Sequence, residues 1–288
     1  MTASAGVIRA ARRPPGWQAP GPAPASHPDP SLGPHDGEDL CYLAGDWRIL
    51  QQIDGHRWSL DDLVTAWVAA TVVADRPPHR FLDLGCGIGT ALMLVAWKFP
   101  DASGLGVEAQ PASVDLARRS LAWNGAAPRA EVRLGDFRDA RVLAGTTAFD
   151  LVTGTPPYLT PGHATASHRP QCGPCHFEER GGVEEYCAAA ARVLAPGGRF
   201  VMCAAAFQQD RVVHGAETVG LAIDGLMRVV PREGKDVLFD VFVARRPGDT
   251  AASSGVIPSS MVVRDRAGQW TPAFAELRRA MGMPTGHA

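Results

Sequence analysis

A glycine-rich stretch, Asp83-Leu-Gly-Cys-Gly-Ile-Gly-Thr90, has glycines at alternate positions directly after an acidic residue. Glycines let a backbone turn sharply and approach a ligand without side chains in the way. The dinucleotide fingerprint would need a third glycine where Thr90 stands, and a P-loop would need a Gly-Lys-Ser/Thr ending. The carboxylate of Asp83 would repel a pyrophosphate and attract a cationic amino acid group. The stretch therefore favours a positively charged ligand.

Two further acidic residues stand at corresponding places later in the chain. Glu108 follows about one strand, one helix and one strand after Asp83, where an acid can accept hydrogen bonds from both hydroxyls of a ribose. Asp136 could accept from an adenine amino group while Phe137 packs on the ring. Each acid alone also fits a helix cap or a solvated turn, but the ordered set indicates S-adenosylmethionine (SAM). We expect this cofactor to be bound by Asp61, Asp83, Gly85, Cys86, Gly87, Gly89, Glu108, Ala109, Asp136 and Phe137.

A second candidate site is Thr155-Pro156-Pro157-Tyr158. The two prolines fix the backbone, so that the Pro156 carbonyl and the Tyr158 ring are held in set directions. Backbone and side-chain oxygens here could accept hydrogen bonds from an NH2 group, leaving its lone pair free to attack a methyl group, while the ring stacks on the acceptor. The structural alternative is a proline turn after a buried strand. We predict that these four residues hold the methyl acceptor.

These residues require elements that bring strand ends together. Past residue 37, short apolar runs alternate with helix-length patterns, as in α/β proteins. Helices are predicted at 61–73, 90–99, 111–125 and 183–194, and strands at 80–84, 104–107, 130–134, 149–153, 199–205, 226–230 and 237–244. We expect a doubly wound, Rossmann-like sheet of seven strands, mostly parallel with an antiparallel last strand. Ligands bind at the carboxyl ends of the strands in such sheets.

Composition divides the chain into three parts. Residues 1–37 are rich in Pro, Ala and Gly and are predicted to be a disordered tail. Arginines at positions 9, 12 and 13 leave organellar targeting as an alternative, although two prolines follow them and interrupt a helix. Residues 38–248 form the predicted catalytic domain. Residues 249–288 are predicted to be a linker and a short helix at 271–281.

Charge and composition exclude several classes of protein. The 28 Lys and Arg residues nearly balance 30 Asp and Glu residues, so any contact with nucleic acid has to be local. No apolar run is long enough for a membrane span, and the first residues lack the apolar stretch of a signal peptide. Six cysteines are too few for a disulfide scaffold in a chain of this length. We expect a soluble, cytoplasmic protein without a membrane partner and of undetermined oligomeric state.

The glycine loop and the Pro-Pro-Tyr segment resemble those of class I SAM-dependent methyltransferases with an Asn-Pro-Pro-Tyr motif. Over residues 38–282 the chain resembles, more specifically, the bacterial tRNA1(Val) adenine-37 N6-methyltransferases. The segment Asp54-Gly-His-Arg-Trp-Ser-Leu-Asp61 is similar to that family's Asp-Gly-Tyr-Arg-Phe-Ser-Leu-Asp, and 231–235 and 263–272 also resemble family segments. The resemblance implies N6-methylation of adenine. The implied partner is nucleic acid, tRNA first, with rRNA and DNA as alternatives.

Thr155 stands where that family has Asn. An Asn oxygen only accepts, whereas a Thr hydroxyl also has a proton to donate elsewhere. Three interpretations stay open: an acceptor other than adenine N6, recognition carried by Pro156 with help from Thr155, or a slow enzyme. Two other functions also stay open. One is methylation of a protein glutamine, since the same elbow recognises a carboxamide in release-factor methyltransferases, and the other is a non-catalytic cofactor-binding subunit.

The loop at 159–181 departs from the family as well. It holds five side chains that could bind zinc, which are His163, His168, Cys172, Cys175 and His176. A single Cys-x-x-Cys with irregularly spaced histidines lacks the second pair of a zinc site. A thioredoxin-like redox motif would follow the first strand of a βαβ unit instead. We therefore predict a substrate-side flap without metal.

Overall fold

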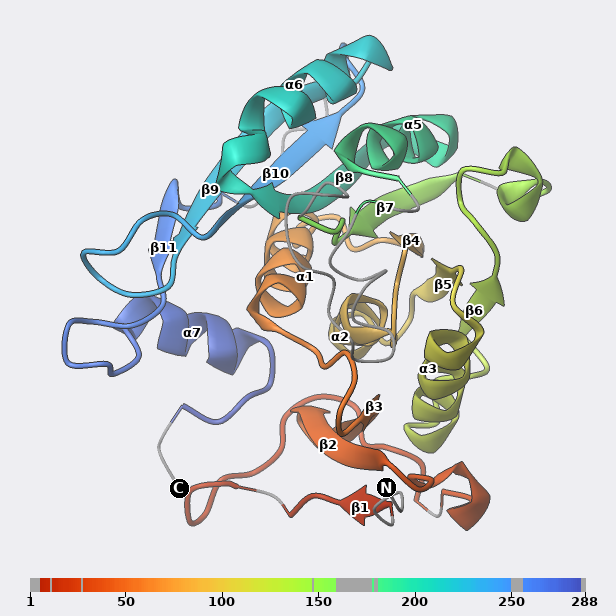
Figure 1. Cartoon of the computed structure of the whole chain (residues 1–288), viewed down its shortest axis with the longest axis vertical. Coiled ribbons are helices and arrows are strands. Elements are labelled where there is room, and N and C mark those ends of the chain that lie inside the picture. The colour runs from red at the N-terminus through yellow and green to blue at the C-terminus, as the bar shows by residue number, and fades with distance from the viewer. Residues whose placement is uncertain are drawn as a thin grey trace.

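The computed structural model describes residues 6–10, 12–26, 28–146, 148–158, 178, 181–249 and 256–285. Its main feature is an eight-stranded sheet in the order β11-β9-β10-β8-β7-β4-β5-β6 (Figure 1). These strands are β4 (Arg80–Leu84), β5 (Ser103–Glu108), β6 (Ala130–Leu134), β7 (Phe149–Gly154), β8 (Leu194–Ala205), β9 (Ala222–Val230), β10 (Phe239–Arg245) and β11 (Ser260–Val262).

The strand order reverses at β4. This strand pairs in parallel with β5 on one side and with β7 on the other. The sheet continues in parallel to β6 beyond β5 and to β8 beyond β7, whereas β10 runs antiparallel to β8 and to β9. A crevice opens at the carboxyl ends of strands wherever neighbouring connections leave in opposite directions. The topology therefore places a ligand site over the ends of β4 and β7.

The predicted mixed α/β sheet is confirmed, with all seven expected strands in place. An eighth strand, β11, adds in parallel to the outer edge of β9. It lies in the segment that we expected to be a linker. Three residues are too few to show an alternating pattern, so this strand is defined by its pairing with residues 228–230 and not by its own sequence.

Helices cover both faces of the sheet. They are α1 (Leu60–Val72), α2 (Thr90–Lys98), α3 (Pro111–Trp123), α5 (Val183–Val193), α6 (Gln209–Thr218) and α7 (Pro272–Ala280), with short 3-10 turns at Pro30–Leu32, Ala140–Leu143 and Ala206–Gln208. The residues of α1, α2, α3 and α7 join one hydrophobic cluster and those of α5 and α6 another. Helix α6 was not predicted. Its buried face consists of Val212, Gly215 and Ala216, which is too small a stripe for a strong helical signal.

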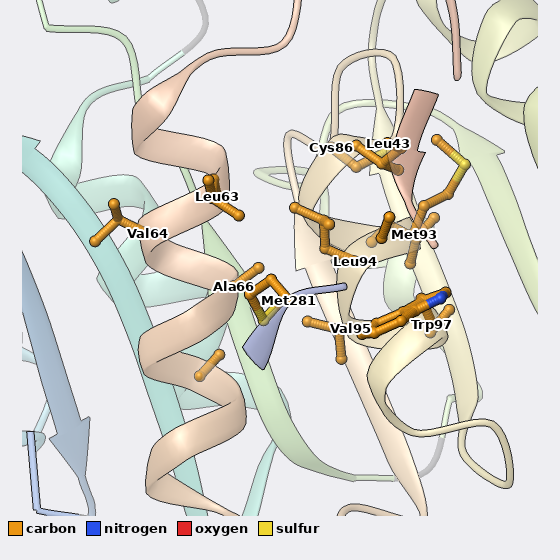
Figure 2. Packing of buried hydrophobic residues seen from close by; sticks show 14 of the residues in the cluster. Leu43, Leu63, Val64, Ala66, Cys86, Met93, Leu94, Val95, Trp97 and Met281 are labelled. Carbon is orange, nitrogen blue, oxygen red and sulfur yellow. The ribbon is translucent and has the colours of Figure 1, made fainter. Parts of the chain in front are cut away.

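The seam between α1 and α2 is filled from three segments (Figure 2). Leu63 and Ala66 of α1 face Leu94 and Val95 of α2, and Met281, which follows α7, lies between the two helices. The Trp97 indole is enclosed by glycines from separate parts of the chain. A Cβ atom built on Gly21 or on Gly282 would come within 2.4 Å of that ring. Only glycine leaves room for the indole at these places, and the backbone nitrogen of Gly45 donates to the Gly282 carbonyl at 2.7 Å.

A second, three-stranded sheet of β1 (Val7–Ile8), β2 (Glu38–Ala44) and β3 (Trp47–Gln52) packs against α3. Its β1 lies within the segment that we expected to be disordered, and the structure differs from that expectation at the described residues. Asp39 is fully buried and pairs with Arg9 at 2.9 Å and with Arg57 at 3.1 Å. A buried carboxylate needs such partners, which gives the low-complexity segment a point of attachment. The division of the chain into domains stays a prediction.

Candidate active site

A cavity of about 210 Å³ lies at the carboxyl ends of the strands around the β4 and β7 crevice. Of the residues predicted to form the site, all except Asp83 and Gly89 line it. Its walls also include residues that we did not predict, which are His56, Ser59, Asp62, Ile88, Thr90, Gln110, Gly181 and Tyr186. The predicted cofactor loop and the predicted acceptor segment thus border one space.

The floor of the cavity is the glycine loop between β4 and α2. Gly85, Gly87 and Gly89 have φ angles of +60°, +53° and +86°, in the left-handed region that favours glycine. A Cβ atom on Gly87 would meet nothing within 4 Å, so the backbone is open toward the cavity there. A Cβ on Gly89 would instead lie 3.1 Å from that of Ala117. Gly89 therefore permits α2 to pack on α3 and does not face a ligand.

Asp83 lies beneath this loop and not on the cavity wall, because its carboxylate is buried between the first turn of α2 and Thr153 of β7. Its carboxylate accepts hydrogen bonds from the Leu92 backbone nitrogen at 3.0 Å and from the Thr153 hydroxyl at 2.8 Å. Burial raises the pKa of Asp83 to about 6, against the effect of these two bonds. This geometry therefore does not provide the direct contact between Asp83 and a cationic ligand that we expected. Asp83 instead ties β4, α2 and β7 together under the site.

Glu108 reaches from the end of β5 over the loop. Its Oε2 accepts from the Gly87 backbone nitrogen at 3.0 Å and its Oε1 accepts from that of Gln110 at 2.7 Å. These bonds fix the carboxylate at the wall of the cavity. The side chain therefore positions the glycine loop and faces the cavity at once.

Asp136 and Phe137 form the wall beyond β6. The Asp136 carboxylate pairs with Arg138, whose Nη2 lies 2.5 Å from Oδ2. The Phe137 ring meets Tyr186 of α5 edge to face, with centroids 4.6 Å apart and an angle of 63° between the planes. An aromatic pair of this kind stiffens an apolar wall. We did not predict Tyr186 as a site residue, because in the sequence it looks like an ordinary core residue on the buried face of a helix.

The acceptor side begins directly after β7. The Tyr158 hydroxyl donates to Asp61 Oδ2 at 2.9 Å and lies 3.3 Å from the Cys203 sulfur. Its ring stacks on Phe239 of β10 with centroids 6.5 Å apart and an angle of 23° between the planes. Burial raises the pKa of Tyr158 well above its ordinary value, and the nearby Cys203 and Asp61 add to that shift. Tyr158 therefore stays a neutral phenol that is held at both ends.

The N-terminus of α1 closes the acceptor side. The backbone nitrogen of Ser59 donates to Asp62 Oδ2 at 3.0 Å, and the Ser59 hydroxyl donates to Asp61. Burial and the neighbouring Asp61 raise the pKa of Asp62 well above its ordinary value, and the hydrogen bond from the Ser59 backbone offsets part of that shift. We predicted Asp61 as a site residue but not Asp62, which in the sequence looks like a helix-capping residue alone.

The chemistry of the lining residues decides which ligand fits. Asp61, Glu108 and Asp136 place carboxylates around an open glycine floor, with the Phe137 ring beside them. Within the described part of the lining there is no Lys or Arg, so a phosphate would find no cationic side chain there. A sulfonium-bearing nucleoside, in contrast, matches carboxylates for its cationic end and ribose and a ring for its base. The residues present therefore fit SAM.

Among the residues that the structure describes, no group of three or more His, Cys, Asp or Glu side chains is placed so that it could hold a metal ion. The predicted candidate ligands from His163 to His176 lie outside the described residues. The described helices also include none long and apolar enough to cross a bilayer.

Comparison with known proteins agrees with this geometry. Residues 76–224 match the model of a methyltransferase domain family. The tRNA1(Val) (adenine(37)-N6)-methyltransferase of Porphyromonas gingivalis is 27% identical over 221 residues, which cover 75% of this chain and 84% of that protein. The release factor glutamine methyltransferase of Caulobacter vibrioides is 30% identical over 176 residues, covering 55% of this chain and 57% of that protein.

A solved structure described as a predicted O-methyltransferase from Agrobacterium tumefaciens shares the fold. It has a TM-score of 0.55 at 21% identity and covers 78% of this chain and 98% of its own. The family match spans the glycine loop, the strand ends and the acceptor segment. The chain belongs to the methyltransferase domain family and is a SAM-dependent methyltransferase.

Proposed function

We propose that this enzyme is an N-methyltransferase that methylates the exocyclic amino group of adenine in a tRNA. The observation that carries the proposal is the single cavity bordered both by the glycine loop and by Thr155-Pro156-Pro157-Tyr158. The name of the Porphyromonas relative, which covers most of both chains, supports adenine N6 as the acceptor. The expected cytoplasmic location is part of the same proposal.

The geometry supports an amine as the acceptor. SAM supplies a methyl group on a positively charged sulfur. The acceptor segment contributes oxygen atoms that accept hydrogen bonds from the N–H groups of an amino group, which leaves the nitrogen lone pair free. Tyr158 offers a flat ring whose position is fixed by Asp61 and Phe239. Holding two reactants in line accounts for a large part of the rate of such transfers. The amino nitrogen attacks first and its proton then leaves to water, so no catalytic base is required.

The first experiment is methyl transfer from tritiated SAM to separate fractions of total tRNA, total rRNA and ribosomal proteins. We expect label in tRNA, and digestion to nucleosides should place it in N6-methyladenosine. Label confined to protein would contradict the proposal and favour glutamine, as the name of the Caulobacter relative suggests. SAM binding by isothermal titration without transfer to any fraction would favour a non-catalytic subunit.

The role of Tyr158 is tested with Tyr158→Ala. We expect methyl transfer to be abolished while SAM affinity stays within a few-fold, because the ring lies on the acceptor side of the cavity. Tyr42→Ala is the matched control, since Tyr42 lies on β2 against Arg13 and Arg48, away from the cavity lining. Equal loss of SAM affinity and transfer in Tyr158→Ala would refute the assignment.

A further inference from the structure

Five arginines gather on the three-stranded sheet and on the segment that precedes it. They are Arg9, Arg12 and Arg13 near the N-terminus, Arg48 of β3, and Arg57 between β3 and α1. Arg9, Arg12 and Arg57 are exposed, and the other two are half-buried. The whole chain has a formal net charge of −2, so these five residues, called the arginine surface below, differ from it in sign.

One end of the arginine surface begins beside the active-site cavity. Arg57 directly follows His56, which lines that cavity. Arg57 and Arg9 share the buried carboxylate of Asp39, at 3.1 Å and 2.9 Å. The Arg48 Nη1 donates to the Arg9 carbonyl at 2.9 Å. Because β1 pairs with β2 directly before Arg9, these contacts carry the surface from the cavity along the small sheet (Figure 1).

Aromatic rings order the other end of the surface. The guanidinium groups of Arg48 and Arg13 lie 3.9 Å and 4.3 Å from the centre of the Tyr42 ring. Arg13 also lies 4.7 Å from the centre of the Trp17 ring, and Arg12 borders the same small hollow. A guanidinium held on a ring keeps its N–H donors in set directions and loses less conformational entropy when it binds a ligand.

Few carboxylates balance this charge. Among the described ion pairs of the arginine surface, Asp39 serves two arginines and Asp46 pairs with Arg13 at 2.7 Å. Two carboxylates thus face five guanidinium groups. Each guanidinium has five N–H donors, so one that contacts a carboxylate can also contact a phosphate. The planar fork of arginine matches the oxygens of a phosphate group.

We propose that the arginine surface binds the phosphate backbone of the RNA substrate, outside the methylated nucleotide. This inference rests on the proposed methylation of RNA and names the surface that holds the rest of that molecule. The described lining of the cavity includes no Lys or Arg, so the contacts with phosphate have to come from elsewhere. Three of the arginines precede residue 38, where the resemblance to the tRNA adenine methyltransferases begins.

The test measures binding of fluorescent total tRNA by anisotropy at several salt concentrations. Each phosphate contact contributes about 0.7 to 0.9 to the slope of log K against log salt, which is about four- to fivefold in affinity at about 0.15 M salt relative to about 1 M. Arg12→Gln/Arg13→Gln removes two charges and keeps the pairing of Arg9 with Asp39. Its slope should be shallower by about 1.4 to 1.8, and its affinity about 15- to 30-fold lower. An unchanged slope would overturn the proposal, as would a wild type that does not bind tRNA.

Arg76→Gln/Arg245→Gln is the matched control. It removes the same charge at the opposite edge of the sheet, because Arg76 lies beyond the end of α1 and Arg245 ends β10. Its slope should equal that of the wild type, and an equal change in both double variants would contradict a local surface. Tyr42→Ala removes no charge and should also keep the slope. Arg12→Gln alone should make the slope shallower by about 0.7 to 0.9, which preserves the test if the double variant folds poorly.

Steady-state kinetics give a second readout. The arginine surface does not touch the reacting atoms, so Arg12→Gln/Arg13→Gln should raise KM for tRNA and leave kcat and SAM affinity within about twofold. A lower kcat at saturating tRNA would contradict this role.

The binding titration needs no methyl transfer, which separates this inference from the proposed function. The expected change of slope without transfer to tRNA would refute the proposed function and support the surface. Transfer to tRNA, together with wild-type binding by Arg12→Gln/Arg13→Gln, would refute the surface alone.

Discussion

The buried Asp83 carboxyl should make the stability of this enzyme depend on pH in an unusual direction. Burial raises the folded-state pKa of Asp83 to about 6 from an ordinary 3.8. Between these values the folded protein binds more protons at this site than the unfolded chain does. Stability therefore falls as pH rises through this range, in contrast to the usual carboxylate, which stabilises the fold when ionised.

The size of the effect follows from the two pKa values. A difference of about two units corresponds to about 3 kcal/mol of unfolding free energy between strong acid and neutral pH. At pH 5 the unfolded carboxyl is already mostly ionised while the folded one is mostly protonated. About 1.4 kcal/mol of this contribution is therefore still present at pH 5 and is lost by pH 8.

The assay is urea unfolding at several pH values from 5 to 8 for the wild type and for Asp83→Asn. Asparagine has nearly the same shape and can still accept from the Leu92 nitrogen, but it does not titrate. Subtracting the two profiles cancels groups that do not interact with Asp83, and measuring both proteins in the Asp62→Asn background removes Asp62, whose pKa the charge of Asp83 raises. The wild type should lose about 1.4 kcal/mol relative to Asp83→Asn as pH rises from 5 to 8. A difference that is constant across this range, or of opposite sign, would refute the reasoning.

Two further predictions concern the glycine loop and the buried ion pair on α3. Gly85→Ala and Gly87→Ala each force a side chain into the left-handed region, at about 1 to 2 kcal/mol. Only the Cβ added by Gly85→Ala also meets the Tyr186 hydroxyl, at 2.2 Å, so this variant should have the lower melting temperature of the two. Gly87→Ala should mainly weaken SAM binding. Equal melting temperatures of the two variants would contradict this prediction. Arg119→Met leaves Glu38 buried without the guanidinium that it contacts at 2.8 Å, and should cost about 3 to 5 kcal/mol in urea unfolding. A loss below about 1 kcal/mol, typical of a surface pair, would show that the pair is solvated.

Much of the site could be predicted because a parallel sheet gathers the carboxyl ends of its strands at one edge. Glu108, Asp136 and Thr155 each follow a predicted strand, and the structure brings all three to one cavity. The same rule does not tell to which side a strand-end side chain points. Asp83 follows the rule by position, yet it lies under the loop because Leu92 and Thr153 draw its carboxylate inward.

The missed residues depend on packing between elements that are distant in sequence. Asp62 borders the same cavity as the acceptor segment because α1 packs against β7, and Tyr186 reaches the glycine loop because α5 covers the opposite face. Patterns within one element cannot show such contacts. The described part of the expected tail is likewise attached through Arg9, which pairs with the buried Asp39 of β2. That pairing could not be predicted from the tail's own composition.

The closure of the α1 and α2 seam by Met281 has a consequence for the order of assembly. A nascent chain that has emerged from the ribosome only as far as β10 already holds the strands from β4 to β10, but it lacks β11, the methionine that fills this seam and the Gly282 carbonyl that accepts a hydrogen bond from the Gly45 nitrogen. Since α1 carries Asp61 and Asp62, we expect the acceptor half of the cavity to gain its final packing after the segment around Met281 has joined the seam. The contacts of Gly21 and Gly45 with the Trp97 indole are completed by Gly282, which lies more than 230 residues later in the chain.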